Sequence, residues 1–290
     1  MSSGTLVIRS STPRPWGEHF SVLRLVGTVW RNRALIRSFA GREVLERNKG
    51  AALGVVWNVA NPLITLAVYT AVFGYIFGSR WEKGDLPARL DFPITFFTGQ
   101  MLFHVFAECA NRAPTLVTSR PNLVRRVVFP LEILPVTVVC SSLVTLAISA
   151  AIVLTITAMA TGGLHWTVVL LPVVCVPLVL LSLGVTWFLA AVGVFVRDVR
   201  NIVVVATQLL MFMTPLFYRI DRIPAEHTWL RWIVQHNPLS VIVENGRRCV
   251  LWGEPLEWEK LGVVTGVGFV AMVCGFAVFS MLRRSMADVH

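Results

Sequence analysis

The feature that most constrains this chain is the run from Ile133 to Val196, which contains no Asp, Glu, Lys or Arg. As one helix the run would extend roughly 95 Å, at about 1.5 Å per residue, whereas the hydrocarbon core of a bilayer is about 30 Å thick. The run must therefore fold back on itself, and Gly162 and Gly163 near its middle supply a turn. A soluble core could not bury so long an apolar stretch, so the run predicts two membrane-spanning helices.

The rest of the chain is similarly apolar. Of its 290 residues, 55% are hydrophobic and 14% are charged, against about 25% charged in soluble domains. Further apolar stretches of spanning length lie on either side of the run. The sequence therefore predicts an all-α integral membrane protein whose residues 55–290 form six transmembrane helices, at about 55–78, 93–111, 134–160, 168–195, 200–218 and 261–282.

The second predicted span is the most polar, because Gln100, His104 and Glu108 fall within it. Polar side chains inside a membrane span usually face protein or water. We expect this span to be broken or partly exposed to water.

The distribution of basic residues predicts the orientation. With six spans, both termini lie on one side of the membrane, and that side carries seventeen of the 26 Lys and Arg residues while the other carries nine. By the positive-inside rule both termini are cytoplasmic, in a multi-pass protein of the cytoplasmic (inner) membrane. The net charge of +10 is divided among segments that flank spans, which favours membrane lipids over nucleic acid as its partner. No removable signal peptide is expected in the first 50 residues.

Residues 1–54 form the predicted cytoplasmic N-terminal region. Its apolar residues recur at helical spacing between Val22 and Trp30, and the stretch "RALIRSFAGREVLERNKG" mixes apolar and charged residues in the same way. Two amphipathic helices are expected here. Plain anchoring at the membrane surface and docking of a partner both explain them.

Two further segments lie between spans. The cytoplasmic segment at about 112–133 contains a predicted short helix from Asn122 to Val128. The external segment at about 219–260 contains two apolar stretches divided by Asn237 and Pro238. Each is too short to span, so they are candidate re-entrant or interfacial helices.

Aromatic residues recur on the first and fifth spans, at Tyr69, Phe73 and Phe77 and at Phe212, Phe217 and Tyr218. Such rings can line a path for sugars, whose C–H faces stack on π surfaces. Helix packing and an interfacial belt are the alternative uses.

The segment "GVFVRDVRNI" places Arg197, Asp198 and Arg200 between two apolar runs. The arginines mark a short cytoplasmic turn between the fourth and fifth spans. Asp198 is either a solvated carboxylate near a helix N-terminus or a functional group.

Motifs that would supply chemistry are absent from the sequence. It has no G-x-x-x-x-G-K-[ST] phosphate loop, no H-E-x-x-H zinc pair and no G-x-S-x-G elbow. We therefore expect no catalytic residue and no metal site. A channel, or the membrane half of a machine that another subunit drives, fits best.

Four stretches carry a family resemblance: "LGVVWNVANPLITLAVYTAVFGYIF", "VVFPLEILP", "GVFVRDVRNIVVVATQLLMFMTPLFY" and "HNPLSVIVENGRR". In content and order they resemble the permease subunits of ABC-2-type polysaccharide and teichoic acid exporters, the Wzm and TarG group. The resemblance implies two permease copies, paired with two ATPase subunits that hold ATP and Mg. This assembly would move a lipid-linked glycan, such as O-antigen, galactan, capsule or teichoic acid, from the inner to the outer leaflet.

The resemblance also implies roles for residues. The stretch from Arg33 to Gly50 and the segment from Asn122 to Val128 would rest on the ATPase. Residues 225–250 would cap the channel externally, and the aromatic rows would line it near the dimer axis. The charged turn matches the family's charged turn after the fourth span, and our hypothesis is that it anchors a cytoplasmic gate near the lipid phosphate. The implied ATPase contacts are Arg37, Arg42, Glu43, Arg47, Asn122, Arg125 and Arg126.

Three alternatives remain at this point. A drug or small-lipid exporter of the same superfamily would share the topology and the partner. A membrane-embedded glycosyl or acyl transferase should show clustered acids or histidines at one membrane face. A secondary carrier should show repeated halves with interrupted spans.

Overall fold

The computed structural model describes residues 22–46, 54–120, 130–224 and 226–288, and within these ranges the chain is helical without a strand. The predicted helix at 122–128 lies outside the described residues. So do Arg47, Asn122, Arg125 and Arg126.

Four helical segments are long and apolar enough to cross a membrane. They form because a backbone in lipid must satisfy its own hydrogen bonds. In chain order they are α3 (Trp57–Tyr69) continued by the π-helix η3 (Thr70–Ile76), α6 (Ile133–Thr161), the 3-10 turn η5 (Trp166–Leu170) continued by α7 (Leu171–Phe195), and α11 (Trp258–Asp288), whose spanning part ends at Arg283. Gly162 ends α6 in the left-handed region, at φ 78°, which confirms the predicted turn.

The second and fifth predicted spans are helices of a different kind. The helix α4 (Ala88–Arg112) has 25 residues, begins five residues before the prediction, and carries charged residues near both ends. The helix α8 (Val199–Met213) has 15 residues and ends before the predicted residue 218. At about 1.5 Å per residue α8 is roughly 22 Å long, so the prediction of a helix to 218 is wrong.

The early end of α8 has a local cause. Pro215 disfavours the helical conformation of the residue before it, and Thr214 is extended, with ψ 134°. The carbonyl groups that follow accept hydrogen bonds from the fully buried guanidinium of Arg247, at 2.7 Å for Pro215 and 3.0 Å for Leu216. A side chain thus satisfies backbone groups that a continued helix would have satisfied.

Helices α7 and α11 pack closely through glycine. A Cβ atom on Gly184 of α7 would overlap the backbone of Ala271, and one on Gly275 of α11 would overlap Gly184. Small residues allow helix backbones to approach where no hydrophobic effect drives association.

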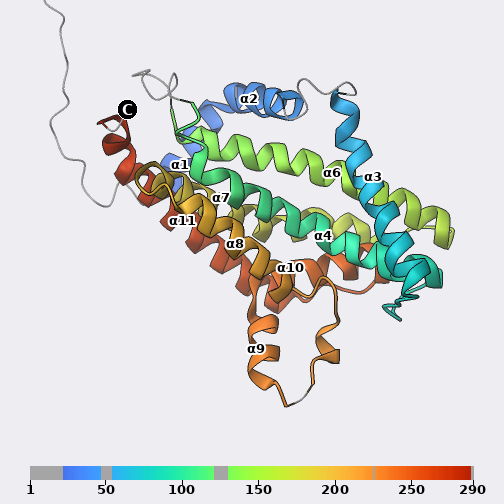
Figure 1. Ribbon diagram of the computed structural model, residues 1–290. Helices are drawn as coiled ribbons and strands as arrows, with labels where there is room; N and C mark the ends of the chain where they lie inside the picture. The colour runs from blue at the N-terminus through green and yellow to red at the C-terminus, as the bar shows by residue number, and fades with distance from the viewer. Residues whose placement is uncertain (1–21, 47–53, 121–129, 225, 289–290) are drawn as a thin grey trace, which may run out of the picture.

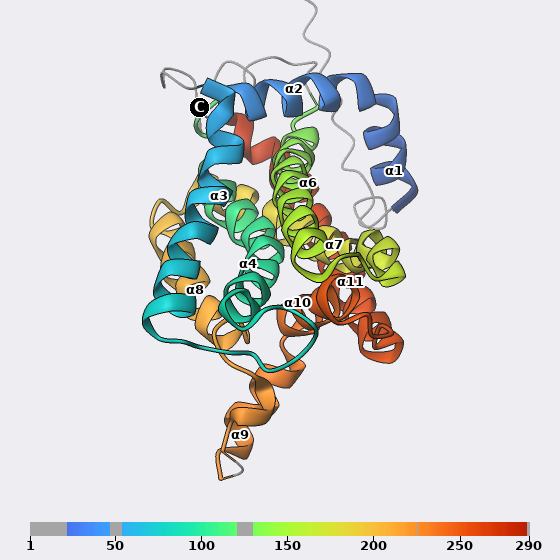
Figure 2. The same ribbon diagram turned by 90° about the vertical axis from the view of Figure 1, so that its right-hand side faces the viewer.

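The two ends of the bundle carry different short helices (Figure 1). At one end, α1 (Val22–Arg31) leads into α2 (Arg33–Glu46), which packs on α6. Figure 2 shows α2 lying across this end, where the C-terminus of α11 also lies. The opposite end carries α9 (Thr228–His236) and α10 (Pro238–Arg247), which meet at Asn237 as the sequence predicts. Of the two, α9 projects away, whereas α10 packs against α4, α7 and α11.

Candidate functional site

One continuous group of rings joins the two predicted aromatic rows. Phe96 of α4 links them: its ring centroid lies 4.5 Å from that of Tyr69 and 4.7 Å from that of Phe217. Phe92, on the same helix, lies 4.9 Å from Phe73. We call this group the aromatic row: Tyr69, Phe73, Phe77, Phe92, Phe96, Phe212 and Phe217.

The middle of the aromatic row is buried, and its two ends are exposed. Phe96 is 1% exposed, whereas Phe77 and Phe212 at its two ends are 67% and 62% exposed. Tyr218 lies beside the row and donates a hydrogen bond to the carbonyl of Phe212, at 2.9 Å. In this conformation the row is a packed wall between α3, α4 and the end of α8. Ring packing and a sugar path are both compatible with it.

Sequence reasoning missed Phe92 and Phe96. Their signal was present, because they follow the same i, i+4 spacing on α4 that marked Tyr69 and Phe73 on the first predicted span.

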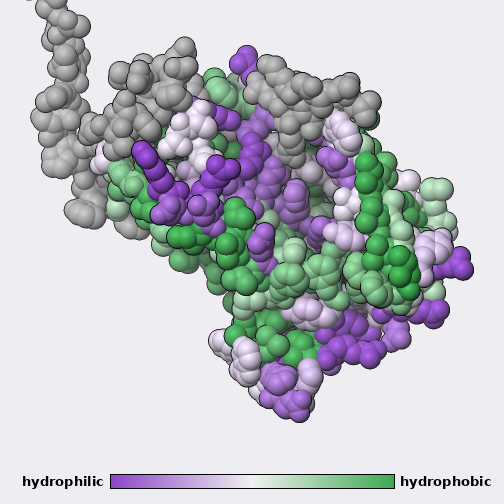
Figure 3. Space-filling model, in the orientation of Figure 1, coloured by the Kyte–Doolittle hydropathy of each residue, from purple (hydrophilic) through white to green (hydrophobic). Residues whose placement is uncertain are grey.

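A polar cavity of about 500 Å³ lies between α3, α4 and α6. Figure 3 shows a hydrophilic area over α4, between the apolar surfaces of α3 and α8. Within the cavity, Glu108 pairs with Arg112 at 3.0 Å and approaches His104 at 3.9 Å. The Gln100 amide nitrogen lies 3.4 Å from the Tyr69 hydroxyl, so the cavity adjoins the aromatic row. Further polar lining residues are Asn58, Asn61, Thr65, Asn111, Thr145 and Ser149.

This cavity explains the polar second span. The helix α4 is unbroken, and its residues Gln100, His104 and Glu108 all line the cavity. The expectation of a partly water-facing helix agrees with that placement.

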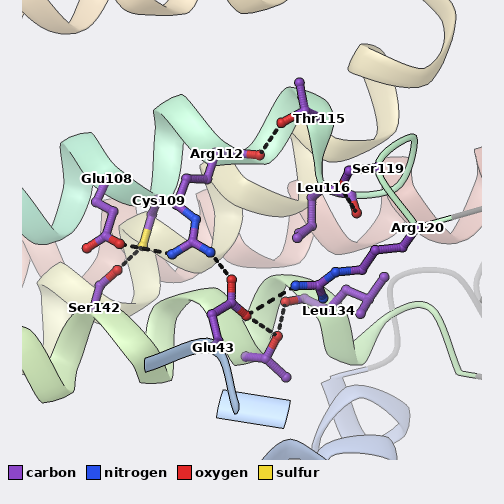
Figure 4. A network of polar contacts seen from close by, with 11 residues as sticks. Glu43, Glu108, Cys109, Arg112, Thr115, Leu116, Ser119, Arg120, Leu134 and Ser142 are labelled. Atoms are coloured by element: carbon purple, nitrogen blue, oxygen red, sulfur yellow. Dashed lines mark hydrogen bonds and ion pairs between the residues drawn. The ribbon is translucent and has the colours of Figure 1, made fainter. Parts of the chain in front are cut away.

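Glu43 of α2 binds three separate parts of the chain (Figure 4). It accepts hydrogen bonds from Arg112 at the end of α4, from Arg120 at 3.5 Å, and from Thr137 of α6 at 3.5 Å. Its side chain is 3% exposed. The helix α2 is therefore tied to the bundle by one buried carboxylate, and we call Glu43, Arg112, Arg120 and Thr137 the Glu43 network.

The structure separates the residues predicted to face an ATPase. Arg37 and Arg42 are exposed on α2. Glu43 points into the bundle instead, so it does not lie on the outer surface of α2. The other four lie outside the described residues.

The predicted charged turn joins α7 to α8. Arg197, Asp198 and Arg200 are all exposed, and within the described ranges none of the three forms an ion pair. Asp198 occupies the N-cap position of α8 without a side-chain capping bond. Gly193, just before the turn, packs against the backbone of Pro114 beyond α4, so the turn lies at the α2 end of the molecule.

These features define a class of protein. A helical membrane bundle holds a polar cavity, an aromatic row and a surface helix tied to its core, and its sequence lacks a phosphate-binding loop. Among the described residues no three His, Cys, Asp or Glu lie close enough to hold a metal ion. This is the architecture of a membrane transport subunit.

Comparison with known proteins gives the family. The pattern of the ABC-2 type transporter family matches residues 34–251, so the chain belongs to that family and is a transporter component rather than an enzyme. It is 27% identical, over 92% of its length and 99% of the relative's, to the O-antigen export system permease protein RfbA of Myxococcus xanthus. Two proteins of the same name from Klebsiella pneumoniae are 24% and 22% identical, each over 88% of this chain and 94% of the relative.

Proposed function

We propose that this chain is the permease of an ATP-driven exporter that moves a lipid-linked polysaccharide of the O-antigen type to the outer leaflet of the cytoplasmic membrane. The observation that carries the proposal is the match, over nearly the whole of both chains, to O-antigen export permeases. The aromatic row and the adjoining polar cavity support it, because a glycan offers both C–H faces and hydroxyl groups.

The energy source in this proposal is a separate ATPase. The chain has no phosphate-binding loop, so ATP and Mg belong to two ATPase copies, and this chain needs no cofactor. Exposed Arg37 and Arg42 on α2 supply contacts for them. The Glu43 network would then pass motion of α2 to α4 and α6.

The proposed assembly contains a second copy of the chain. The faces of α3 and α8 carry many exposed apolar side chains, and only 11% of the span formed by α3 and η3 is buried within one chain. Pairing through these faces would bring the exposed ends of two aromatic rows, Phe77 and Phe212, toward a shared path.

The proposed entry route begins at the cytoplasmic end. There the exposed guanidinium groups of Arg197 and Arg200 meet the phosphate of the lipid carrier, for which arginine is well suited. The glycan then follows the aromatic row outward, where α9 and α10 cap the path as re-entrant or interfacial helices.

The test is purification of the chain from its native host in mild detergent, followed by mass spectrometry of its partners. We expect a stoichiometric ATPase with a phosphate-binding loop, and loss of surface polysaccharide when the chain is deleted. A folded, dimeric chain without an ATPase would contradict the proposal. Normal surface polysaccharide with altered drug or lipid export would favour the small-lipid exporter.

A further inference from the structure

A second polar hollow lies at the end of the molecule opposite α2. It has a volume of about 350 Å³ and is enclosed by the segment after η3, by α9 and α10, and by the start of α11. We call it the external pocket. Its volume is at the lower end of the usual range for small-molecule sites, about 300–1,000 Å³, so it suits a short piece of a polymer.

Charged groups of both signs line the external pocket, five basic and three acidic, and several of them form ion pairs. Arg219 binds Asp221 through two hydrogen bonds, of 3.0 and 2.6 Å, which holds the pKa of that carboxyl below its usual value. Arg248 and Lys260 both bind Glu257, at 3.3 and 3.0 Å. The walls therefore offer fixed donors and acceptors, which suit the hydroxyl groups of a sugar.

Three residues that line the pocket each carry a buried polar atom without a partner. Within the described part of the chain, Arg231 Nε, Ser240 Oγ and Trp252 Nε1 are buried and make no hydrogen bond. Ser240 is 1% exposed and Trp252 is 9% exposed. Buried polar atoms are normally bonded, so three in one pocket indicate a ligand that bonds them.

The pocket also continues the aromatic row. Trp81 lines the pocket, and its ring centroid lies 5.7 Å from that of Phe92, a member of the row. Lys83 Nζ lies 3.9 Å from the Trp252 ring centroid, which fixes the indole so that its N–H serves as a directed donor. The row therefore leads to the pocket through one further ring.

We propose that the external pocket is an exit subsite that holds a sugar unit of the passing glycan. The hydroxyl oxygens of the sugar accept hydrogen bonds from the side chains of Arg231 and Trp252. The Ser240 hydroxyl forms a hydrogen bond with the same sugar unit. This inference rests on the proposed function. It adds a saccharide site outside the membrane path, where a bound sugar resists backward movement of the chain.

The test uses a photo-crosslinking residue, benzoylphenylalanine, in the whole permease–ATPase complex in cells with labelled glycan. It is placed in turn at Gln235, an exposed residue of the pocket wall, and at Phe212 in the aromatic row. The control is Trp229, which is 65% exposed on the same helix as Gln235 and does not line the pocket. We expect labelled glycan on positions 235 and 212, and none on 229.

The outcomes separate the two proposals. If labelled glycan is crosslinked at position 212 but not at position 235, the exit subsite is overturned and the proposed function stands. No glycan on either position would overturn both.

A second measurement tests two of these three polar atoms, those of Trp252 and Ser240. With the crosslinker at 235, Trp252→Phe and Ser240→Ala should each lower the yield about two- to tenfold, the range expected for one lost hydrogen bond. Arg222→Gln is the control, because Arg222 is 68% exposed and does not line the pocket. Equal yields in all three variants would overturn the assignment of these donors.

Discussion

Glu43 holds the interface helix α2 to the membrane bundle. Its carboxylate accepts from two arginines and a threonine, and Arg112 is shared with Glu108 in the polar cavity. In the proposed exporter, a force on α2 would reach the cavity through these two ion pairs.

Changing Glu43→Gln should uncouple ATP hydrolysis from export. The amide keeps the shape but removes the charge that two arginines face, and we expect a loss of about 1–3 kcal/mol in the free energy of unfolding. That is less than the cost at a fully buried pair, because Arg112 is 35% exposed. Glycan exported per ATP hydrolysed, measured on the purified complex in proteoliposomes, should fall.

Arg42, the residue before Glu43, provides the control variant. Arg42→Gln removes an exposed charge from the same helix, so it should weaken ATPase binding and leave the stability of the permease unchanged. Normal coupling in Glu43→Gln would refute the role of the network.

Arg197→Ala should reduce export and leave membrane insertion intact. Arg197 is exposed at the charged turn, and the variant removes a group proposed to meet the lipid phosphate. Surface glycan is compared with the amount of permease in the membrane. Wild-type export at wild-type expression would contradict a role of Arg197 in a cytoplasmic gate. A loss of membrane insertion alone would indicate that Arg197 serves only to orient the chain in the membrane.

Helical elements were predictable where composition alone decides the structure. The run from Ile133 to Val196 has no charge to place anywhere but in helices within lipid, so α6 and α7 lie where predicted. The break at Asn237 and Pro238 was predictable for a local reason, since proline favours the first turn of a helix. The end of α8 was missed, although Pro215 marked it.

Features that depend on tertiary contacts were not predictable. The α2 sequence carries charges on several faces, so nothing local showed that Glu43 turns inward while Arg37 and Arg42 turn outward. The aromatic row needs Phe92 and Phe96, and their position depends on how α4 fits between α3 and α8. The external pocket joins residues from 81 to 260, a separation that no sequence window covers.

Phe73→Ala should slow export without abolishing ATPase binding. Phe73 lies on η3, and its ring contacts Tyr69 of α3 and, at 4.9 Å, Phe92 of α4, so its removal interrupts the aromatic row. Phe269→Ala is a matched control, because Phe269 is 44% exposed on α11 and belongs to no ring contact of the row. Glycan export measured at equal ATPase content should fall in the first variant alone, and equal export in both would count against an aromatic path.

The α7–α11 contact should fail when its glycine is enlarged. In Gly275→Leu the new side chain would overlap the backbone of Gly184, which cannot move aside as a flexible side chain could. We expect a loss of about 1–3 kcal/mol in the free energy of unfolding, seen as a lower unfolding midpoint in detergent. Gly262→Leu, on the same helix with open space around it, should leave the midpoint unchanged, and equal midpoints for the two variants would contradict the close packing.

At the scale of the whole molecule, the number of crossings depends on α4 and α8, because the other four spans are long and apolar. At 15 residues α8 is roughly 8 Å shorter than a hydrocarbon core of about 30 Å. The non-helical residues after it complete the crossing in the proposed topology. Non-helical backbone is tolerated at membrane depth where protein buries it, and Thr214 and Leu216 are fully buried beside Arg247.

Single cysteines on either side of these two helices test the six-span topology. Asp85→Cys and Ser119→Cys flank α4, and Asp198→Cys and Glu226→Cys flank α8, all at exposed positions. With an impermeant maleimide we expect Asp85→Cys and Glu226→Cys to be labelled in intact spheroplasts, and the other two only after permeabilisation, above the background of the five native cysteines. If both members of a pair were labelled from the same side, that helix would not cross. A failure of α8 alone would leave five spans, and the C-terminus of α11 would then lie on the external side.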